Sequence, residues 1–512
     1  MSRSPGRAWT VAVLAGLVAL IALARLHTYH EPLDRDIAFY RVIAHEMSAG
    51  RPLYSDLWCH QPPGAFLTWA AAEHLAGYGP GAVYLLGVAS AVLSLFGVYF
   101  AGAAFRGGSA GGLWAAGLWA VVSGDLGLEA NQPNLESFLN TCCIWSLVLL
   151  ARSDPRLPKA RLAAIGLLFA AIVFYKHVVI IIPIFLALAH VAYPTTGSNR
   201  SRALREAAVM IAIIFVPWAV LFGYLAASGR FEVGFASLVT YNLSYSGMRA
   251  GGVLPNVLAS FSPDKLLPSY FHFSLPLSIV ALVGAVSGLA RGPRRPWVLL
   301  LGYAAGAHLA IGFTGMFFPH YYQLRLPWLV IGAGWVLAEL GRAGGRRMAV
   351  GIHGLGLILL VPLVAHVAPA YRLDPEAWSR EKYGGIFVEV RDLSERVDAL
   401  LAPAEIFFVW GNEPGFNLYT QRPPPAGTLF VSFYLRGPLR EPLTRQTLNQ
   451  IERSPPELWI VMKAAQNPST MNHPVYAWFA DRYEPLDGVP ASDSFLLYRL
   501  RGGRLAQRME HP

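Results

Sequence analysis

The sequence predicts a polytopic α-helical membrane protein with about eleven transmembrane helices and a soluble C-terminal α/β domain. Composition is the first reason: 54% of the 512 residues are hydrophobic and only 14% are charged, whereas an ordinary soluble protein carries about 25% charged residues. A soluble core could not absorb that excess of apolar side chains, but a bilayer can. The second reason is a series of long apolar runs, and the third is the position of the basic residues between them.

Eleven apolar runs are long enough for a helix to cross roughly 30 Å of hydrocarbon. The first is long for the apolar part of a signal peptide and no clear cleavage site follows it, so we expect it to be retained. Two short runs meet at Lys176-His177, and this boundary decides the count. The runs are residues 8–26, 81–104, 110–127, 134–151, 161–175, 178–193, 207–227, 273–290, 297–314, 326–341 and 348–368.

Lys and Arg residues cluster in alternate connections between these runs. With eleven spans all clusters fall on one side, whereas omitting one span would scatter them onto both, and the positive-inside rule makes that one side cytoplasmic. We therefore expect an inner (plasma) membrane protein with a cytoplasmic N-terminus and a periplasmic or extracellular C-terminal domain. The clusters contain Arg3 and Arg7, then Arg106, then Arg152, Arg156, Lys159 and Arg161, then Arg200, Arg202 and Arg205, then Arg291, Arg294 and Arg295, and then Arg342, Arg346 and Arg347.

The net charge of +10 follows from these topology signals and does not indicate nucleic-acid binding. The chain has no basic face with interleaved aromatic residues, which a nucleic-acid-binding surface would show. We therefore expect membrane lipid, and no nucleic acid, among the partners.

The predicted topology divides the chain after residue 369. Residues 1–369 form a transmembrane module whose first outer loop spans 27–80, and residues 370–512 form a soluble domain on the outer face. In that domain an amphipathic helical pattern at 388–401 precedes short apolar runs typical of strands. The runs are Ile406–Trp410, Leu429–Tyr434, Leu458–Met462 and Phe495–Tyr498.

Asp34 and Asp36 follow the first span directly, at the outer membrane surface. Two carboxylates two residues apart do not share a helix face, so we expect them to have different roles. A carboxylate close to hydrocarbon is partly desolvated, which raises its pKa and its basicity. That property suits a general base acting on a sugar hydroxyl. The alternative is that both are interfacial charges that cap a helix.

Further motifs follow the acidic pair in a fixed order on the outer side. They are Gly50-Arg-Pro-Leu-Tyr54-Ser-Asp56, the Pro62-Pro63 turn, Asn131-Gln-Pro-Asn-Leu-Glu136, and Phe318-Pro-His-Tyr-Tyr322 running into Leu326-Pro327. This order resembles the GT-C membrane glycosyltransferases, and more narrowly the bacterial branch related to protein O-mannosyltransferases and lipid A aminoarabinose transferases. The resemblance covers nearly the whole chain, and a C-terminal outer α/β domain is also of that type.

The resemblance implies a catalytic role for Asp36, which matches the proposed base of the family. Ile37 follows it here, where relatives often have Glu. Relatives also often have Lys before the Pro-Pro turn, whereas this chain has Gln61. From the resemblance and from their charge and position, the candidate substrate-binding residues are Asp34, His60, Gln61, Glu129, Glu136, Lys176, His320, Tyr321 and Arg325.

A cation is needed where the donor phosphate binds, because negative charge builds on that phosphate as its bond to the sugar breaks. Lys176 lies between two spans, and placing a charged side chain within a membrane costs free energy, so such residues usually have a function. The alternative is that the Lys176 side chain extends to the membrane interface and has no role in binding. His320 and Tyr321 are candidates too, with an aromatic belt as their alternative. Arg325 precedes a span on the outer side, against the positive-inside trend. His60 is a further substitute.

Glu129 and Glu136 flank a Pro-containing turn at the outer surface. They could orient the acceptor or hold a divalent cation. No His, Cys or Asp cluster has convincing ligand spacing, so the sequence supports no metal site and indicates no certain cofactor.

Together these features predict an enzyme that transfers a sugar from a polyprenyl-phosphate donor to a hydroxyl of a glycan, lipid or protein acceptor, with inversion at C1. One alternative is a polymerase or ligase that uses lipid-linked oligosaccharide, and another is a lipid-carrier transporter. Transporters usually hold polar residues near the bilayer midplane. Here the ionisable residues gather at the outer surface, which disfavours transport.

Overall fold

The computed structural model describes residues 6–104, 108–152, 157–247, 252–291, 294–343, 345–488 and 492–510. Arg3, Arg106 and Arg156 of the predicted basic clusters lie outside the described residues. Within those ranges, each of the eleven predicted spans coincides with a helix. The helices are α1 (Arg7–His27), α4 (Pro80–Ala104), α5 (Gly108–Val122), α6 (Leu135–Ala151), α7 (Lys159–Tyr175), α8 (Ile181–Ala192), α9 (Arg200–Ala227), α14 (Leu275–Arg291), α15 (Arg294–Thr314), α16 (Leu326–Ala343) and α17 (Gly345–Val367).

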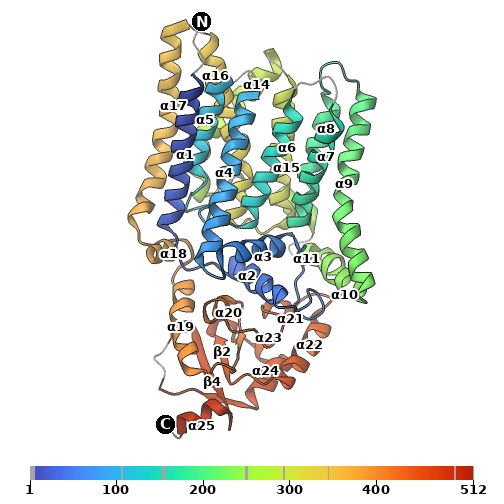
Figure 1. Cartoon of the computed structure of the whole chain (residues 1–512), viewed down its shortest axis with the longest axis vertical. Coiled ribbons are helices and arrows are strands. Elements are labelled where there is room, and N and C mark those ends of the chain that lie inside the picture. The colour runs from blue at the N-terminus through green and yellow to red at the C-terminus, as the bar shows by residue number, and fades with distance from the viewer. Residues whose placement is uncertain are drawn as a thin grey trace.

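These helices form one bundle (Figure 1). Seven helical segments of the described residues are long and apolar enough to cross a membrane, and α5, α6 and the segment His177–Ala192 are shorter apolar helices. Large apolar side chains on the outside of the bundle remain exposed, such as Leu23 at 63% and Val220 at 67%. Exposed apolar surface on this scale fits contact with lipid. The two short helices that flank Lys176, α7 and α8, both lie in the bundle, as predicted.

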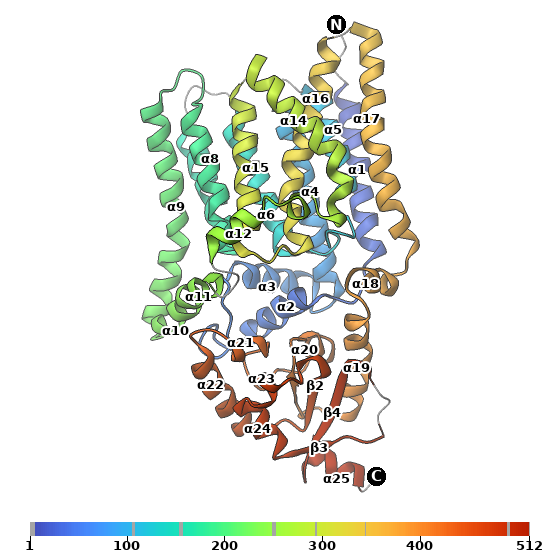
Figure 2. The same ribbon diagram turned by 180° about the vertical axis from the view of Figure 1, so that it is seen from behind.

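The N-terminus and the C-terminal domain lie at opposite ends of the bundle (Figures 1 and 2). Helices α2 and α3 lie between the bundle and that domain, across the end of the bundle. They belong to a set of short helices from the predicted outer loops. This set consists of α2 (Arg35–Ser48), α3 (Gly64–Ala76), η1 (His177–Ile180), α10 (Phe231–Phe235), the π-helical turn η2 (Ala236–Thr240), α11 (Tyr241–Gly247), α12 (Val253–Ala259), α13 (Pro263–Leu266), η3 (Ser269–Ser274) and η4 (Pro319–Arg325).

The C-terminal segment forms a small α/β domain. Its four-stranded sheet has the order β1-β2-β4-β3, with β1 parallel to β2 and β4 antiparallel to β2 and β3. The strands are β1 (Phe407–Trp410), β2 (Leu458–Met462), β3 (Tyr483–Pro485) and β4 (Phe495–Leu500). The helices are η5 (Ala368–Arg372), α18 (Pro375–Tyr383), α19 (Ile386–Leu400), α20 (Gly415–Thr420), α21 (Ser432–Leu435), α22 (Arg440–Arg453), η6 (Lys463–Ala465), α23 (Pro468–Met471), α24 (Pro474–Ala480) and α25 (Arg504–Glu510).

The predicted strand at Leu429–Tyr434 is wrong. This run forms a turn and the start of the short helix α21, because a short apolar run does not by itself distinguish a strand from a buried helical turn. The helical turn directs the Phe433 ring against Trp58 of the first outer loop, at 4.7 Å between ring centroids. The short edge strand β3, which ends in proline, was not predicted.

The C-terminal domain forms hydrogen bonds directly with the first outer loop. The backbone N–H of Trp58 donates to the carbonyl of Gly427 at 3.0 Å, and the Gln450 amide donates to the Asp56 carboxylate at 2.5 Å. Arg51 donates to the same carboxylate at 2.7 Å. The domain therefore lies against the segment that carries the acidic pair.

Candidate active site

The acidic pair begins helix α2. Asp34 is the N-cap residue, and its carboxylate accepts a hydrogen bond from the backbone N–H of Ile37 at 2.7 Å. Asp36 lies in the first helical turn, where the helix dipole favours a negative charge. The predicted alternative, a helix cap, is therefore the observed role of Asp34.

Asp34 is held from three sides. Besides the bond from Ile37, its Oδ2 accepts hydrogen bonds from Asn134 at 3.3 Å and from the hydroxyl of Tyr383 at 3.2 Å. Burial raises the pKa of Asp34 to about 6, and the negative charges of Asp36 and Glu129 act in the same direction. All of these contacts fix the position of this carboxylate and occupy its oxygens.

Asp36 is in a different situation. Its side chain is half-buried, and none of the described residues donates a hydrogen bond to it. Burial raises the pKa of Asp36, whereas the positive charges of His320, Arg35 and Lys176 oppose this shift. The two aspartates therefore have different surroundings, and the oxygens of Asp36 remain available to a ligand.

The acidic loop, residues 129–136, lies beside the two aspartates. Glu129 contacts the His320 ring at 2.8 Å, and Glu136 pairs with Lys176 at 2.8 Å. Glu129 has a positive φ of 54°, a conformation that non-glycine residues seldom adopt and that often marks a functional site. The Lys176 ammonium also lies 3.7 Å from the centre of the Tyr321 ring. Five predicted site residues thus lie together next to Asp36.

Gln61 and His60 border this group in different ways. The Gln61 amide donates to the Tyr40 hydroxyl at 3.2 Å, and Tyr40 lies one helical turn after Asp36 on the same face of α2. His60 lies among aromatic rings, 5.3 Å from Tyr241 between ring centroids. Burial lowers the pKa of His60 to about 3, and the positive charges of His177 and Lys176 add to that effect. This lowered pKa disfavours a positive charge on His60.

Arg325 points toward a different neighbourhood. Its guanidinium donates to the carbonyl of Leu266 at 2.6 Å and contacts the His308 ring at 2.6 Å. It also lies over the Tyr322 ring, 4.7 Å from its centre. No contact of the described residues joins Arg325 to the aspartates, so the structure does not bring it into the carboxylate group.

The C-terminal domain side supplies residues that sequence reasoning missed. Lys382, beside Tyr383 in α18, pairs with Glu31 at 2.5 Å, and both side chains are fully buried. Glu413 accepts a hydrogen bond from Arg35 Nε at 3.0 Å. The partners are separated by more than 300 positions in the sequence, so no local pattern could reveal them.

No metal centre is preformed in the part of the chain that the structure describes. No group of three or more His, Cys, Asp or Glu side chains is arranged to hold a metal ion there. Glu129 and Glu136, considered for a divalent cation, are each paired with a nitrogen base instead.

Comparison with known proteins identifies solved structures with a similar fold. No protein-family model and no curated protein sequence matches the chain. Among solved structures, ArnT from Cupriavidus metallidurans bound to undecaprenyl phosphate is similar, with a TM-score of 0.60 and 16% identity over 96% of this chain and 98% of that chain. The oligosaccharyltransferase of Archaeoglobus fulgidus is similar with a TM-score of 0.56 and 13% identity, over 94% of this chain and 73% of that chain.

The chain has the GT-C fold. The predicted resemblance to GT-C glycosyltransferases is thereby confirmed at the level of architecture. In this GT-C fold the start of α2 contacts the acidic loop, and the acidic loop contacts η4. Helix α2 lies at the end of the bundle that faces the C-terminal domain (Figure 2). Asp34, Asp36, Glu129, Glu136, Lys176, His320 and Tyr321 form this group, which we call the carboxylate cluster.

Proposed function

We propose that the chain is a membrane glycosyltransferase that transfers a sugar from a polyprenyl-phosphate donor to a hydroxyl acceptor, with Asp36 as the general base. The observation that carries the proposal is Asp36 itself: a half-buried carboxylate that receives no hydrogen bond from the described residues and lies close to Lys176 and His320. The ArnT structure of similar fold contains undecaprenyl phosphate, which supports a polyprenyl-phosphate carrier.

The reaction is a single displacement. Asp36 removes the proton from the acceptor hydroxyl while its oxygen attacks C1 of the sugar, and the bond between C1 and the phosphate oxygen breaks. The electron pair of that bond leaves with the polyprenyl phosphate, whose charge Lys176 stabilises. Attack from the face opposite the leaving group inverts C1. The acceptor is a glycan, a lipid or a protein.

The location of the reaction follows from the same arrangement. Helix α2, which carries Asp36, lies at the end of the bundle opposite the N-terminus. With the N-terminus in the cytoplasm, as the positive-inside rule indicates, the cluster and the C-terminal domain face the periplasm or the cell exterior across the inner (plasma) membrane. We assign catalysis to residues 1–369 and completion of the site to residues 370–512, which contribute Lys382, Tyr383 and Glu413.

The test is an assay of the purified protein in lipid nanodiscs with a panel of undecaprenyl-phosphate sugars. Released undecaprenyl phosphate is measured with and without a cell-envelope acceptor fraction. We expect acceptor-dependent release, and we expect Asp36→Asn to lower it about 100-fold or more, the usual scale of general base catalysis. Asp481→Asn, at an exposed position of the C-terminal domain, is the matched control and should keep full activity. Full transfer by Asp36→Asn would show that the base is another group.

A second candidate is a ligase that transfers a whole oligosaccharide. The likeness to an oligosaccharyltransferase is the observation that favours it. The same assay with a lipid-linked oligosaccharide as donor separates the two, because a ligase prefers the longer glycan. Movement of intact donor across the membrane without release of the lipid phosphate would instead indicate the transporter.

A further inference from the structure

Residues 31–35 lead into helix α2, and we call them the entry segment. Glu31 and Asp34 of this segment are buried, at 4% and 6% exposure. Asp36 directly follows the segment, in the first turn of α2. The path of the entry segment therefore determines where the Asp36 carboxylate lies.

The C-terminal domain holds the entry segment from one side. The backbone N–H of Leu33 donates to the hydroxyl of Tyr419 at 2.8 Å, and the hydroxyl of Tyr383 donates to the Asp34 carboxylate at 3.2 Å. Together with the ion pair of Arg35 described above, these contacts reach three consecutive residues of the segment.

Lys382 joins the same domain to both the entry segment and the acidic loop. Its ammonium lies 2.5 Å from Oε1 of Glu31 and donates to Oδ1 of Asn131 at 2.9 Å. The Asn131 amide in turn donates to Oε2 of Glu31 at 2.5 Å. The Lys382 and Glu31 side chains are fully buried. The three side chains, which come from α18, the acidic loop and the entry segment, thus form a closed ring of contacts.

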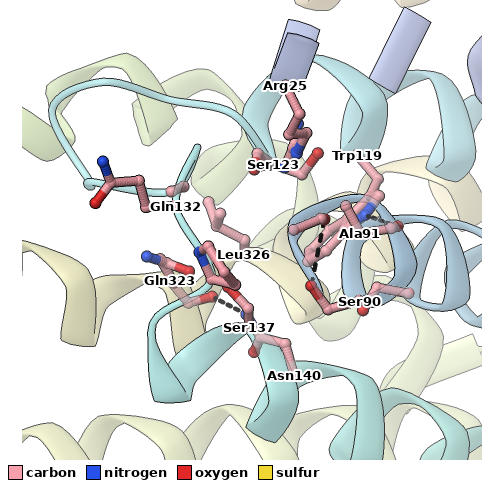
Figure 3. A pocket seen from close by; sticks show the side chains of 14 residues that line it. Arg25, Ser90, Ala91, Trp119, Ser123, Gln132, Ser137, Asn140, Gln323 and Leu326 are labelled. Carbon is pink, nitrogen blue, oxygen red and sulfur yellow. Dashed lines mark hydrogen bonds between the residues drawn. The ribbon is translucent and has the colours of Figure 1, made fainter. Parts of the chain in front are cut away.

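A small polar cavity lies beside the acidic loop, inside the bundle (Figure 3). Three residues of the loop, Gln132 among them, line this cavity. The Gln132 amide is nevertheless turned away from Arg25 and Ser123 (Figure 3), and it donates to the carbonyl of Pro32 at 3.5 Å. The cavity leaves the loop without close packing on that side, so the loop depends on its contacts with the entry segment for a fixed position.

The burial of the Lys382–Glu31 pair indicates what the pair contributes. Two charges lose their hydration when they are buried, so a buried ion pair adds little net stability. Replacing both partners with uncharged residues of similar size is often neutral, whereas removing one partner leaves an unpaired charge and destabilises the fold. The pair is therefore better suited to select one arrangement of the elements it joins than to stabilise the protein.

We propose that Lys382 is a positioning residue, which acts through Glu31 and Asn131 to place Asp36 for proton transfer. The ring of contacts holds α18, the acidic loop and the entry segment in one arrangement, and α2 begins from that arrangement. This role rests on the proposed function, in which Asp36 is the general base. The C-terminal domain thereby contributes to catalysis through a residue that acts on Asp36 indirectly.

The first measurement does not require enzymatic activity. It compares hydrogen exchange of the wild type with that of the double variant Glu31→Gln/Lys382→Met, as full-length protein in lipid nanodiscs. We expect faster exchange in peptides that cover the entry segment, the start of α2 and the acidic loop, and wild-type rates in the C-terminal sheet. The unfolding temperature should stay close to that of the wild type, because both buried charges are removed together.

The second measurement is the release of undecaprenyl phosphate. We expect the double variant to lower kcat about 10- to 100-fold, the scale of a small misplacement of a reacting group. The KM for the donor should not change, because Lys176 is unaltered. In an Asp36→Asn background the double variant should cause no further loss, since a misplaced base and an absent base affect the same step.

The matched control is Glu484→Gln/Arg499→Met. It removes an ion pair of 2.8 Å between strands β3 and β4 of the C-terminal domain, and it should leave both kcat and the exchange of the entry segment unchanged. If Glu31→Gln/Lys382→Met does not fold, Asn131→Ala replaces it, because this variant keeps the ion pair and removes only its link to the acidic loop. Faster exchange of the loop and a lower kcat in Asn131→Ala would support the proposal, and wild-type values of both would overturn it.

The two measurements separate this proposal from the proposed function. Wild-type exchange of the double variant in all three segments would overturn the positioning role, whatever reaction the protein catalyses. Full activity of the double variant, with Asp36→Asn inactive, would overturn it as well. Faster exchange with full activity of both the double variant and Asp36→Asn would support the structural role of the ring and contradict the assignment of the base.

Discussion

At the scale of single residues, the lysine and arginine side chains in and around the carboxylate cluster each have an acidic partner. Lys176 pairs with Glu136, Lys382 with Glu31, and Arg35 with Glu413. Within the described residues, Asp34 and Asp36 are the acids of this region without such a pair. The region therefore carries excess negative charge before a substrate binds, and that charge sets how the two aspartates titrate.

The first prediction concerns pH. A general base must be ionised, and burial raises the pKa of Asp36 above its ordinary value and that of Asp34 to about 6. Transfer activity should therefore fall as the pH is lowered through about 6, where the pair takes up a proton. Asp34→Asn removes one negative charge beside Asp36 and should move this acid limb to lower pH. Asparagine still caps α2. An acid limb that does not move would mean that the titrating group is not coupled to Asp34.

The second prediction concerns Lys176. Replacing it with Gln removes a charged contact to the donor phosphate, so the KM for the donor should rise about 10- to 100-fold. The same change leaves Glu136 buried without a partner, which should also lower the free energy of unfolding. The double variant Lys176→Gln/Glu136→Gln should recover the stability but not the KM. Recovery of both would show that Lys176 acts only through its ion pair.

At the scale of elements, the long helices were predictable and the short ones were not. Apolar runs of sufficient length indicated α1, α4 and α9 directly, because a membrane span needs about 20 apolar residues. The first outer loop has no such run, and its helices α2 and α3 are fixed by packing between the bundle and the C-terminal domain. The strand prediction for Leu429–Tyr434 was wrong for the same reason. The conformation of this run depends on the residues packed around it and not on its pattern of apolar residues.

For the candidate site too, some features could be predicted from the sequence and others could not. Asp36, Glu129, Glu136, Lys176 and His320 could be predicted to share one surface, because charge sidedness and span count fix the topology. Their pairing could not be predicted, since it depends on turns such as the left-handed conformation of Glu129. The contacts made by Tyr383 and Glu413 depend on how the C-terminal domain docks, which no local pattern encodes.

The third prediction tests that docking through Gly427. A Cβ at this position would overlap the carbonyl oxygen of Asp56 in the first outer loop. Gly427→Ala should therefore push the domain away from the loop, lower the unfolding temperature and reduce transfer, with Asp36 itself intact. Gly79→Ala is the control, because a Cβ there meets no atom within 4 Å. Wild-type activity and stability in Gly427→Ala would mean that the interface accommodates the methyl group without loss.

At the scale of the whole molecule, the chain is a helical bundle with the carboxylate cluster at one end. The N-terminus and the C-terminal domain lie at opposite ends of the bundle, so the orientation of the protein decides on which side of the membrane the carboxylate cluster lies. A polyprenyl-phosphate donor needs no nucleotide, so a site on the outer face can function where nucleotide sugars are absent. Orientation is therefore part of the proposed function.

The last prediction tests that orientation in intact cells. A cysteine introduced by Arg436→Cys, exposed in the C-terminal domain, should react with a membrane-impermeant maleimide. A cysteine introduced by Arg200→Cys, exposed at the opposite end of the bundle at the start of α9, should react only after the inner membrane is permeabilised. The native Cys59 and Cys143 are buried and Cys142 is half-buried, and unsubstituted protein measures their background. The reverse pattern would place the carboxylate cluster in the cytoplasm, where nucleotide sugars are available, and would remove the reason for a lipid-phosphate donor.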